Sequence, residues 1–311
     1  MCDAPSPPMR ITILLCTLNG APYLEAQLAS YLDQSHGAWD LWVSDDGSTD
    51  GTWDIVQGFA RAHGAGRTIR VIKGPGAGLV KNYLSALCHP DFPGGAVALS
   101  DQDDVWLPHR LTRAVAALEG RAQDVILYGA QCQRTDAALR PISPSRPPRK
   151  PAGFANAAVQ NVVSGNTTSL SPAALALVRQ AGVPDGLAYH DWWLYQLISG
   201  AGGAVVIDPD VVALYRQHGQ SAIGAHRGLG ASLSRLARAV DGTYCGWVHR
   251  NWAALQARAD LMAPGPRAAL EAVTTASPGL PRLRALRHNG FFRQGTFSHG
   301  TMLVLAALGR L

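Results

Sequence analysis

The sequence predicts an α/β fold: a mostly parallel, mixed sheet with helices on both faces, followed by a helical C-terminal region. Short apolar runs alternate with segments of helical periodicity through the first half of the chain. Polar residues follow directly after several of these runs, and the last third of the chain is helical in pattern and rich in arginine. At 311 residues the chain is long enough to bury a substantial core.

The first half supplies the strands and helices of this sheet. Four short apolar runs have the composition of buried strands, at residues 11–18, 41–45, 68–74 and 96–100. The segments after them carry apolar residues at helical spacing, namely Leu24, Leu28, Tyr31 and Leu32, then Trp53, Val56 and Phe59, then Leu79, Tyr83, Leu84 and Leu87, and finally Leu111, Val115 and Leu118. Asn19 is expected to cap the first helix. This alternation predicts parallel strands with both faces covered, and ligands at their carboxyl ends.

The second half follows a Pro- and Arg-rich segment, residues 141–153, which we expect to be a loop. Beyond it the sequence predicts a strand within 162–170, a helix near 172–180, an aromatic helix from Asp191 and a strand at 204–209. After about residue 225 the pattern is helical and basic. Within it, residues 227–240 predict an amphipathic helix that either lies on an anionic membrane or packs on protein.

Composition and charge place the chain among intracellular globular proteins. The net charge is +5, and the five cysteines are scattered without a C-x-x-C pair, which fits a reducing compartment better than a disulfide framework. The N-terminus lacks the apolar core of a signal peptide, and the apolar residues 301–309 are too few to span a bilayer. We therefore expect a cytoplasmic protein. Its basic charge suits phosphorylated ligands or an anionic membrane, and no nucleic-acid-binding module is recognisable.

An acidic motif, LSDQDDVWLP at residues 99–108, follows the fourth strand. Three carboxylates within four residues at the end of a buried strand repel one another strongly unless a cation lies among them. The spacing of Asp101 and Asp103 suits one hard divalent ion with open positions for diphosphate oxygens. The alternative is a solvated turn or a helix cap, and it applies best to Asp104.

Weaker signals accompany the acidic motif. Asp45 ends the second strand, where it can accept hydrogen bonds from a base or ribose, although D-D-G-S-T-D is also a good turn and cap. Lys81 starts the helix after a glycine-rich segment and can face an anionic ligand. Asp191, beside two tryptophans, is a candidate general base, or else only a helix cap. Arg216 and His218 follow the strand near residue 209 and are candidates to contact a diphosphate or a metal.

Taken in order, these motifs resemble a known family. The segments C-T-L-N-G, S-D-D-G-S-T-D-G-T, G-x-x-x-K-N, L-S-D-Q-D-D-V-W, H-D-W-W and Y-R-Q-H-G are similar to those of the inverting family 2 glycosyltransferases, and most similar to the rhamnosyltransferases of bacterial surface polysaccharides. The resemblance covers about residues 10–225 and implies the Rossmann-like GT-A fold of nucleotide-sugar transferases. It also implies a catalytic domain at 1–225, with a nucleotide half at about 10–135 and an acceptor half at about 150–225, and a basic helical region at 226–311.

The resemblance assigns roles to individual residues. Thr17 and Asp45 match positions that hold the nucleoside, Asp103 matches the metal ligand, and Asp191 matches the catalytic base. Asp101 matches the first acidic residue of the motif, near ribose and metal, and His218 matches a residue that completes the metal shell in some relatives. The full set of donor-binding candidates is Thr17, Asn19, Asp45, Lys81, Asp101 and Arg216. His190 stands where glutamate is commoner, so its role stays open.

The implied reaction is transfer of a sugar, with rhamnose as the candidate, from a nucleotide-diphosphate donor such as dTDP-rhamnose to an acceptor hydroxyl. It proceeds with inversion, requires Mn²⁺ or Mg²⁺, and uses a saccharide or lipid-linked saccharide acceptor at the inner face of the cytoplasmic membrane. Two alternatives remain. A sugar-nucleotide pyrophosphorylase would need a basic glycine-rich loop after the first strand, where this chain has Thr17 to Gly20. A non-catalytic nucleotide-sugar-binding protein would not need both Asp103 and Asp191.

Overall fold

The computed structural model describes residues 8–218 and 241–311. In chain order its elements are β1 (Ile11–Thr17), α1 (Ala21–Leu32), β2 (Trp39–Asp45), α2 (Thr52–His63), β3 (Ile69–Lys73), α3 (Leu79–Leu87), β4 (Ala96–Ser100), β5 (Val105–Trp106), α4 (Arg110–Leu118), β6 (Ile126–Thr135), β7 (Pro141–Pro144), α5 (Phe154–Ala157), η1 (Gly165–Thr167), β8 (Ser169–Leu170), α6 (Pro172–Ala181), α7 (His190–Gly200), β9 (Ala204–Arg216), α9 (Thr243–Gln256), η2 (Ala259–Leu261), α10 (Pro264–Thr275), α11 (Leu280–His288) and α12 (Thr296–Ala307).

The strands form one mixed sheet in the order β3-β2-β1-β4-β8-β6-β9-β5, with β7 paired to β6. β1 pairs in parallel with β2 and β4, and β2 pairs in parallel with β3, so one half of the sheet is parallel as predicted. The short β8 runs antiparallel between β4 and β6, while β6 and β9 are parallel to each other. The predicted fold class, a mostly parallel mixed sheet with helices on both faces and a helical C-terminal region, is confirmed.

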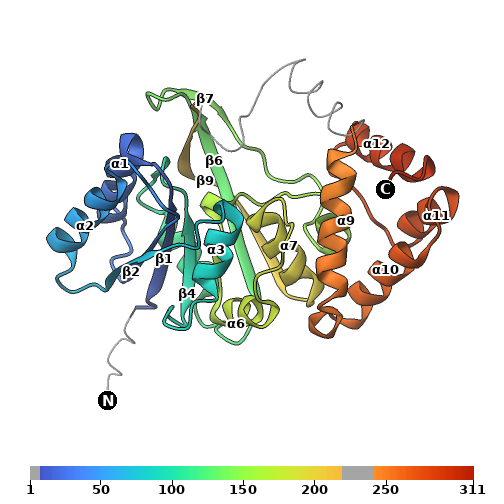
Figure 1. The fold of residues 1–311 in the computed structure, drawn as a ribbon, viewed down its shortest axis with the longest axis horizontal. Coiled ribbons are helices and arrows are strands. Elements are labelled where there is room, and N and C mark those ends of the chain that lie inside the picture. The colour runs from blue at the N-terminus through green and yellow to red at the C-terminus, as the bar shows by residue number, and fades with distance from the viewer. Residues whose placement is uncertain (1–7, 219–240) are drawn as a thin grey trace.

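Strand β1 shows why both faces of the sheet are covered. Ile11, Ile13 and Leu15 point into a core closed by α1, α2 and α4, whereas Leu14 and Cys16 point into a second core closed by α3, α6 and α7. All five side chains are buried. A strand buried on both faces is mostly apolar, and residues 11–16 follow this pattern with Thr12 as the one polar residue. Figure 1 shows α1 and α2 on one side of the sheet and α3, α6 and α7 on the other.

Several predicted elements are corrected. The strand expected within 162–170 is a 3₁₀ turn followed by the two-residue strand β8, because residues 164–168 bend to bond their own turn. The loop expected at 141–153 begins with a strand, β7, which pairs with β6 because its prolines lie at the two strand ends. The strand at 204–209 continues to Arg216 along β6.

Two helix starts also differ from the prediction. Asn19 does not cap α1: Gly20 holds that position, and Asn19 adopts a positive φ of 49° in the preceding turn. Helix α7 begins at His190, with Tyr189 as the N-cap, so Asp191 lies inside the first turn. A cap role for Asp191 is therefore wrong.

The C-terminal helices extend the second core. Trp252 of α9 is buried and its Nε1 donates to the carbonyl of Ala158 (2.9 Å), while the hydroxyl of Tyr244 donates to Val159 (2.8 Å). Figure 1 shows α9 to α12 together at the end of the molecule opposite α1 and α2. The predicted amphipathic helix at 227–240 and the boundary at residue 225 lie outside the described residues. No helix in the described part of the chain has the length and apolar character needed to cross a membrane.

Candidate active site

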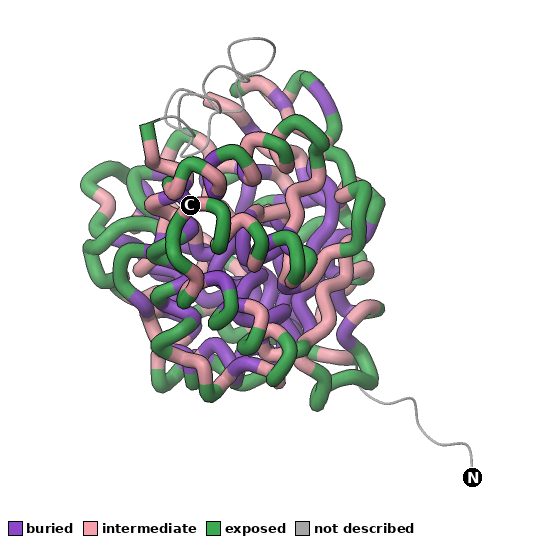
Figure 2. Tube along the Cα trace, turned by 90° about the vertical axis from the view of Figure 1, so that its right-hand side faces the viewer, coloured by how far each residue is buried: buried purple, intermediate pink, exposed green. Residues whose placement is uncertain are grey.

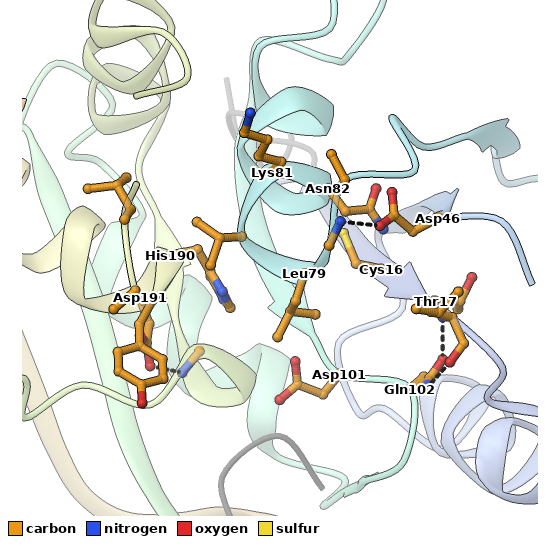
Figure 3. Close-up of a pocket in the computed structure, with 18 of the residues that line it drawn as sticks. Cys16, Thr17, Asp46, Leu79, Lys81, Asn82, Asp101, Gln102, His190 and Asp191 are labelled. Atoms are coloured by element: carbon orange, nitrogen blue, oxygen red, sulfur yellow. Dashed lines mark hydrogen bonds between the residues drawn. The ribbon is translucent and has the colours of Figure 1, made fainter. Parts of the chain in front are cut away.

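A cavity of about 570 Å³ opens at the carboxyl ends of β1, β2 and β4. Its wall is completed by the start of α3, the turn at 164–165 and the segment leading into α7. Figure 3 shows Thr17 and Gln102 on one side, His190 and Asp191 on the other, and Asp101 between them. The predicted residues that line the cavity are Thr17, Lys81, Asp101, Asp103 and Asp191; within the described wall, Asn19, Asp45, Arg216 and His218 are not lining residues.

Asp45 organises the turn after β2. Its carboxylate accepts from the Thr17 hydroxyl (2.8 Å), from the Ser48 hydroxyl (2.6 Å) and from the Ser48 amide (2.8 Å). Asn19 performs a related task, since its side-chain oxygen accepts from the Thr49 amide (2.8 Å). Both residues thus fix the two loops that follow β1 and β2.

Two residues of this edge, Asp46 and Gln102, were not assigned to the site from the sequence, although Asp46 was expected at the strand end. Asp46 lines the cavity and accepts from the amides of Gly76 (2.8 Å) and Gly78 (2.7 Å), which holds the glycine-rich segment against β2. Gln102 accepts from the Leu18 amide (2.8 Å) and donates to the Leu18 carbonyl (2.9 Å). A Cβ at position 20 would lie 2.3 Å from the Gln102 oxygen, so this contact requires Gly20. Gln102, the middle residue of the D-Q-D motif, therefore connects the segment after β4 to the segment after β1 through two hydrogen bonds.

The three aspartates of the acidic motif have different surroundings. Burial, and then repulsion from Asp103, raise the pKa of Asp101 to about 7, although the Tyr83 hydroxyl lies 2.8 Å from its carboxylate. Asp104 is fully buried and accepts from the Asn166 side chain and the Arg216 amide. Burial raises the pKa of Asp104 as well. Asp104 joins the acidic loop to η1 and β9, so it is neither a helix cap nor a solvated turn residue.

The end of β9 lies behind the acidic loop. The Arg216 Nε donates to the Asp103 carbonyl (2.9 Å) and its guanidinium also donates to Ala137, so this buried side chain is used within the protein. The His218 Nε2 lies 2.8 Å from Asp103 Oδ2. Arg216 thereby orients the loop, and His218 adds a nitrogen beside the carboxylate of Asp103.

The side chains at this side of the cavity are of the chemical types that bind a divalent cation. Asp101 and Asp103 supply negatively charged oxygens, and His218 supplies an imidazole nitrogen next to one of them. Carboxylate oxygens suit Mg²⁺ and Mn²⁺, and the raised pKa of Asp101 marks negative charge that the surrounding side chains do not neutralise. Among residues 8–218 and 241–311, however, no three His, Cys, Asp or Glu side chains come together closely enough to enclose an ion.

Asp191 forms the opposite wall. Its carboxylate accepts from the Trp192 amide (2.7 Å) and the Gly165 amide (3.1 Å). Burial raises its pKa to about 6, and hydrogen bonds from Trp192, Asn161 and Gly165 limit the rise. A buried carboxylate with this pKa is ionised at neutral pH and is more basic than an exposed aspartate, which suits proton abstraction.

His190, next to this aspartate, connects the two walls. Its ring stacks on Tyr83 with centroids 3.9 Å apart, and Tyr83 in turn contacts Asp101. Burial lowers the pKa of His190 to about 3, so the imidazole is neutral. Its Nε2 is buried without a hydrogen-bond partner among the described residues and would lie 2.7 Å from a Cβ at position 165, which explains Gly165. A neutral ring here adds no charge beside Asp101 and Asp191.

Lys81 lies at the rim of the cavity. Its ammonium group forms an ion pair with Asp185 (2.7 Å), and both side chains are exposed. The contact leaves Lys81 at the cavity edge, where it can exchange this partner for an anionic ligand.

Comparison with known protein families agrees with the resemblance that the sequence motifs indicate. The sequence profile of Glycosyl transferase family 2 matches residues 12–170, just over half of the chain. The chain belongs to glycosyl transferase family 2. The matched segment includes Thr17, Asp45, Asp101 and Asp103 of this family 2 transferase and ends before Asp191.

Two relatives among the proteins with curated names show the range of the likeness. The chain is 26% identical to the dTDP-rhamnosyl transferase RfbG of Shigella flexneri over 235 residues, which cover 71% of this chain and 78% of that protein. It is 30% identical over 112 residues to TuaG of Bacillus subtilis, a glycosyltransferase named for teichuronic acid biosynthesis, and this match covers 36% of this chain and 43% of TuaG.

Solved structures share the fold of this family 2 transferase. The mannosyltransferase PcManGT from Pyrobaculum calidifontis, in complex with GDP-Man and Mn²⁺, aligns with a TM-score of 0.54 at 20% identity, over 98% of this chain and 87% of that one. S. aureus TarS 1–349 in complex with UDP-GlcNAc also aligns with a TM-score of 0.54, at 17% identity, over 91% of this chain and 88% of TarS 1–349.

Proposed function

We propose that the chain is an inverting glycosyltransferase that moves a sugar from a nucleotide-diphosphate donor to an acceptor hydroxyl in surface polysaccharide synthesis. The observation that carries the proposal is the position of Asp191, a buried carboxylate of raised pKa across the cavity from Thr17 and Asp101 (Figure 3). The likeness of the chain to a dTDP-rhamnosyl transferase supports rhamnose as the sugar and dTDP-rhamnose as the donor.

The donor would lie along the β1–β2–β4 edge. Thr17, Lys81 and Asp101 line the cavity there and are our assignment for direct donor contacts. Asn19, Asp45 and Arg216 would act through the loops that they hold. Their hydrogen bonds to Thr49, Thr17 and Asp103 fix the cavity wall before a donor enters, which reduces the ordering cost of binding.

Asp191 would remove the proton from the acceptor hydroxyl as the oxygen attacks the anomeric carbon. The bond from that carbon to the donor diphosphate breaks, and attack from the opposite face inverts the centre. The amides of Trp192 and Gly165 hold the carboxylate in place. A pKa of about 6 leaves the group ionised at pH 7.

Asp101, Asp103 and His218 are the residues that would hold Mn²⁺ or Mg²⁺. When bound, such an ion supplies charge stabilisation to the leaving nucleoside diphosphate. His218 keeps the Asp103 carboxylate oriented through its contact of 2.8 Å, and Tyr83 does the same for Asp101.

The two parts of the chain would have separate tasks. Residues 1–225 would form the catalytic domain, with donor and acceptor halves, and residues 226–311 a basic region that reaches the acceptor. A saccharide or lipid-linked saccharide is the proposed acceptor, and the proposed location is the cytoplasm, with peripheral contact at the inner face of the membrane.

A donor screen tests the proposal. We expect dTDP-rhamnose with Mn²⁺ to raise the melting temperature more than other nucleotide-diphosphate sugars do, because a ligand of the native state stabilises it. Donor hydrolysis should stop in EDTA and return with Mn²⁺ or Mg²⁺. A larger shift with another donor would overturn the rhamnose assignment, and full hydrolysis in EDTA would overturn the metal requirement.

A further inference from the structure

The last two helices carry an exposed apolar surface. Phe297, Val304 and Leu308 are 77%, 57% and 67% exposed, and Leu280 at the start of α11 is 58% exposed. The spacing of the first three places them on one face of α12, because they lie close to whole helical turns apart. A Cβ at Gly309 would lie 3.4 Å from Pro278, so the end of α12 adjoins the start of α11. We call this the α11–α12 surface.

The same surface is basic. After Glu271 the chain contains no Asp or Glu, but it contains the arginines Arg282, Arg284, Arg287, Arg293 and Arg310. Arg284 and Arg287 are exposed and lie on the face of α11 that also carries Leu280. Figure 2 looks onto this side of the molecule and shows exposed residues on its outer helices around the C-terminus. Exposed apolar and cationic side chains together complement an anionic lipid interface.

The α11–α12 surface is joined to the wall that carries Asp191. Just before α12, Arg293 donates to the Val159 carbonyl (2.8 Å) and the Gln294 amide donates to the Gln160 side chain (2.7 Å). The next residue, Asn161, hydrogen-bonds Asp191. In Figure 1, α12 lies at the upper right of the molecule; the residues that line the cavity place it at the carboxyl ends of β1, β2 and β4.

We propose that the α11–α12 surface docks on an anionic lipid bilayer, with Phe297, Val304 and Leu308 in the interface and Arg284 and Arg287 at the phosphate level. A second copy of the chain fits less well, because a symmetric contact would place these arginines opposite one another. The docking deepens the proposed function, since it brings a lipid-linked acceptor to the wall that holds Asp191. Its test measures binding rather than catalysis, so it can fail independently of the proposed transfer reaction.

The experiment is flotation of the full-length chain with vesicles of phosphatidylcholine alone or mixed with phosphatidylglycerol. Wild type should float only with the mixed vesicles, and less so as salt is raised. Phe297→Ser with Leu308→Ser should lower the partition coefficient at least about tenfold, because each side chain loses its burial in the interface. Arg284→Gln with Arg287→Gln should lower it by about fivefold per arginine.

Matched controls separate docking from general surface effects. Leu32→Ser with Ile142→Ser removes two apolar side chains that are 37% and 43% exposed elsewhere, and Arg61→Gln with Arg121→Gln removes the same charge; both should float like wild type. Melting temperatures and donor hydrolysis are measured on every variant to confirm folding. Three results would overturn the proposal: unchanged flotation of the Phe297/Leu308 variant, equal flotation with neutral vesicles, or lipid-free self-association that this variant abolishes.

Discussion

Asp208 and Asp191 have similar exposed fractions, 9% and 8%, but Asp191 lies deeper in the protein and the partners of the two carboxylates differ. Asp208, on the sheet away from the cavity, accepts from two nitrogens of Arg113 (2.6 and 2.8 Å) and from the Tyr128 hydroxyl (2.8 Å). Burial alone would raise its pKa, but these hydrogen bonds lower it. Asp191 accepts instead from the neutral backbone amides of Trp192 (2.7 Å) and Gly165 (3.1 Å), and burial raises its pKa to about 6.

The difference separates structural carboxylates from functional ones. Where Arg113 neutralises a buried carboxylate, the charge contributes to the fold. Asp191 and Asp101 have no ion pair with any Lys or Arg in the described part of the chain, and both pKa values are raised. Asp104 is also buried without such an ion pair, but it lies outside the cavity wall and accepts from Asn166 and the Arg216 amide. Asp101 and Asp191 line the cavity, where an uncompensated carboxylate is available to a ligand or for proton transfer.

Replacing Asp191 should give the largest effect. Asp191→Asn removes the base and keeps one oxygen, which can still accept from one of the two amides, so turnover should fall by roughly 100-fold or more with donor affinity nearly unchanged. Steady-state kinetics and nucleotide-sugar titration measure the two quantities. Asp54→Asn, on the exposed face of α2, should behave as wild type. If Asp185→Asn were the variant that lost turnover, the base would be Asp185 at the rim.

The pH profile should show the raised pKa directly. Because the base acts only when ionised, kcat/KM should rise with pH through about 6 and then level off. Below that pH the rate should fall about tenfold per unit. An ordinary aspartate would place this limb near 3.8. A profile that stays flat down to pH 5 would show that Asp191 does not limit the rate.

Replacing Asp208 and replacing Asp191 should change the free energy of unfolding in opposite directions. Asp208→Asn should lower the free energy of unfolding at pH 7.5 by about 1 kcal/mol, a modest loss because Arg113 is 36% exposed and solvent screens the pair. Asp191→Asn should raise it by a similar amount, on the order of 1 kcal/mol, since no charge is then buried. Denaturant unfolding curves measure both variants.

The stabilising effect expected for Asp191→Asn follows from the pKa of Asp191 in the folded and in the unfolded chain. In the folded chain Asp191 is protonated up to about pH 6, and in the unfolded chain only up to about 3.8. Its contribution to stability therefore declines as pH rises between these two values and stays low above them. If Asp191→Asn were as destabilising as Asp208→Asn at pH 7.5, the carboxylate would be structural rather than reserved for chemistry.

The sequence was sufficient to predict the parallel half of the sheet and the residues at one edge of the cavity. Apolar strands that end in Thr17 and Asp101 specify both the parallel half of the sheet and the edge at which polar groups gather, because strand direction alone places them there. Asp191 could be found from its motif, although the sequence could not distinguish a cap from a buried residue inside the first turn of α7.

What the sequence could not supply depends on contacts between distant segments. His190 stacks on Tyr83, and Gln102 bonds Leu18, through pairings that no local pattern encodes. Arg216 was expected to reach a ligand, but its guanidinium donates to backbone carbonyls, because β9 continues past Pro209 to Arg216 and carries this side chain behind the acidic loop. The turn at 165–167 was predicted as part of a strand because Val162, Val163 and Thr168 beside it are β-prone, although Gly165 and Asn166 within it are not.

Binding of Mn²⁺ tests the central distinction most directly. Electron paramagnetic resonance can follow free Mn²⁺ as it is titrated with wild type, Asp103→Asn or Asp208→Asn, each with and without dTDP. We predict that wild type and Asp208→Asn bind Mn²⁺, more tightly with dTDP present, and that Asp103→Asn loses this binding, because only the uncompensated carboxylates at the cavity can accept the ion. Equal binding by all three proteins, or none by wild type even with dTDP, would contradict the account.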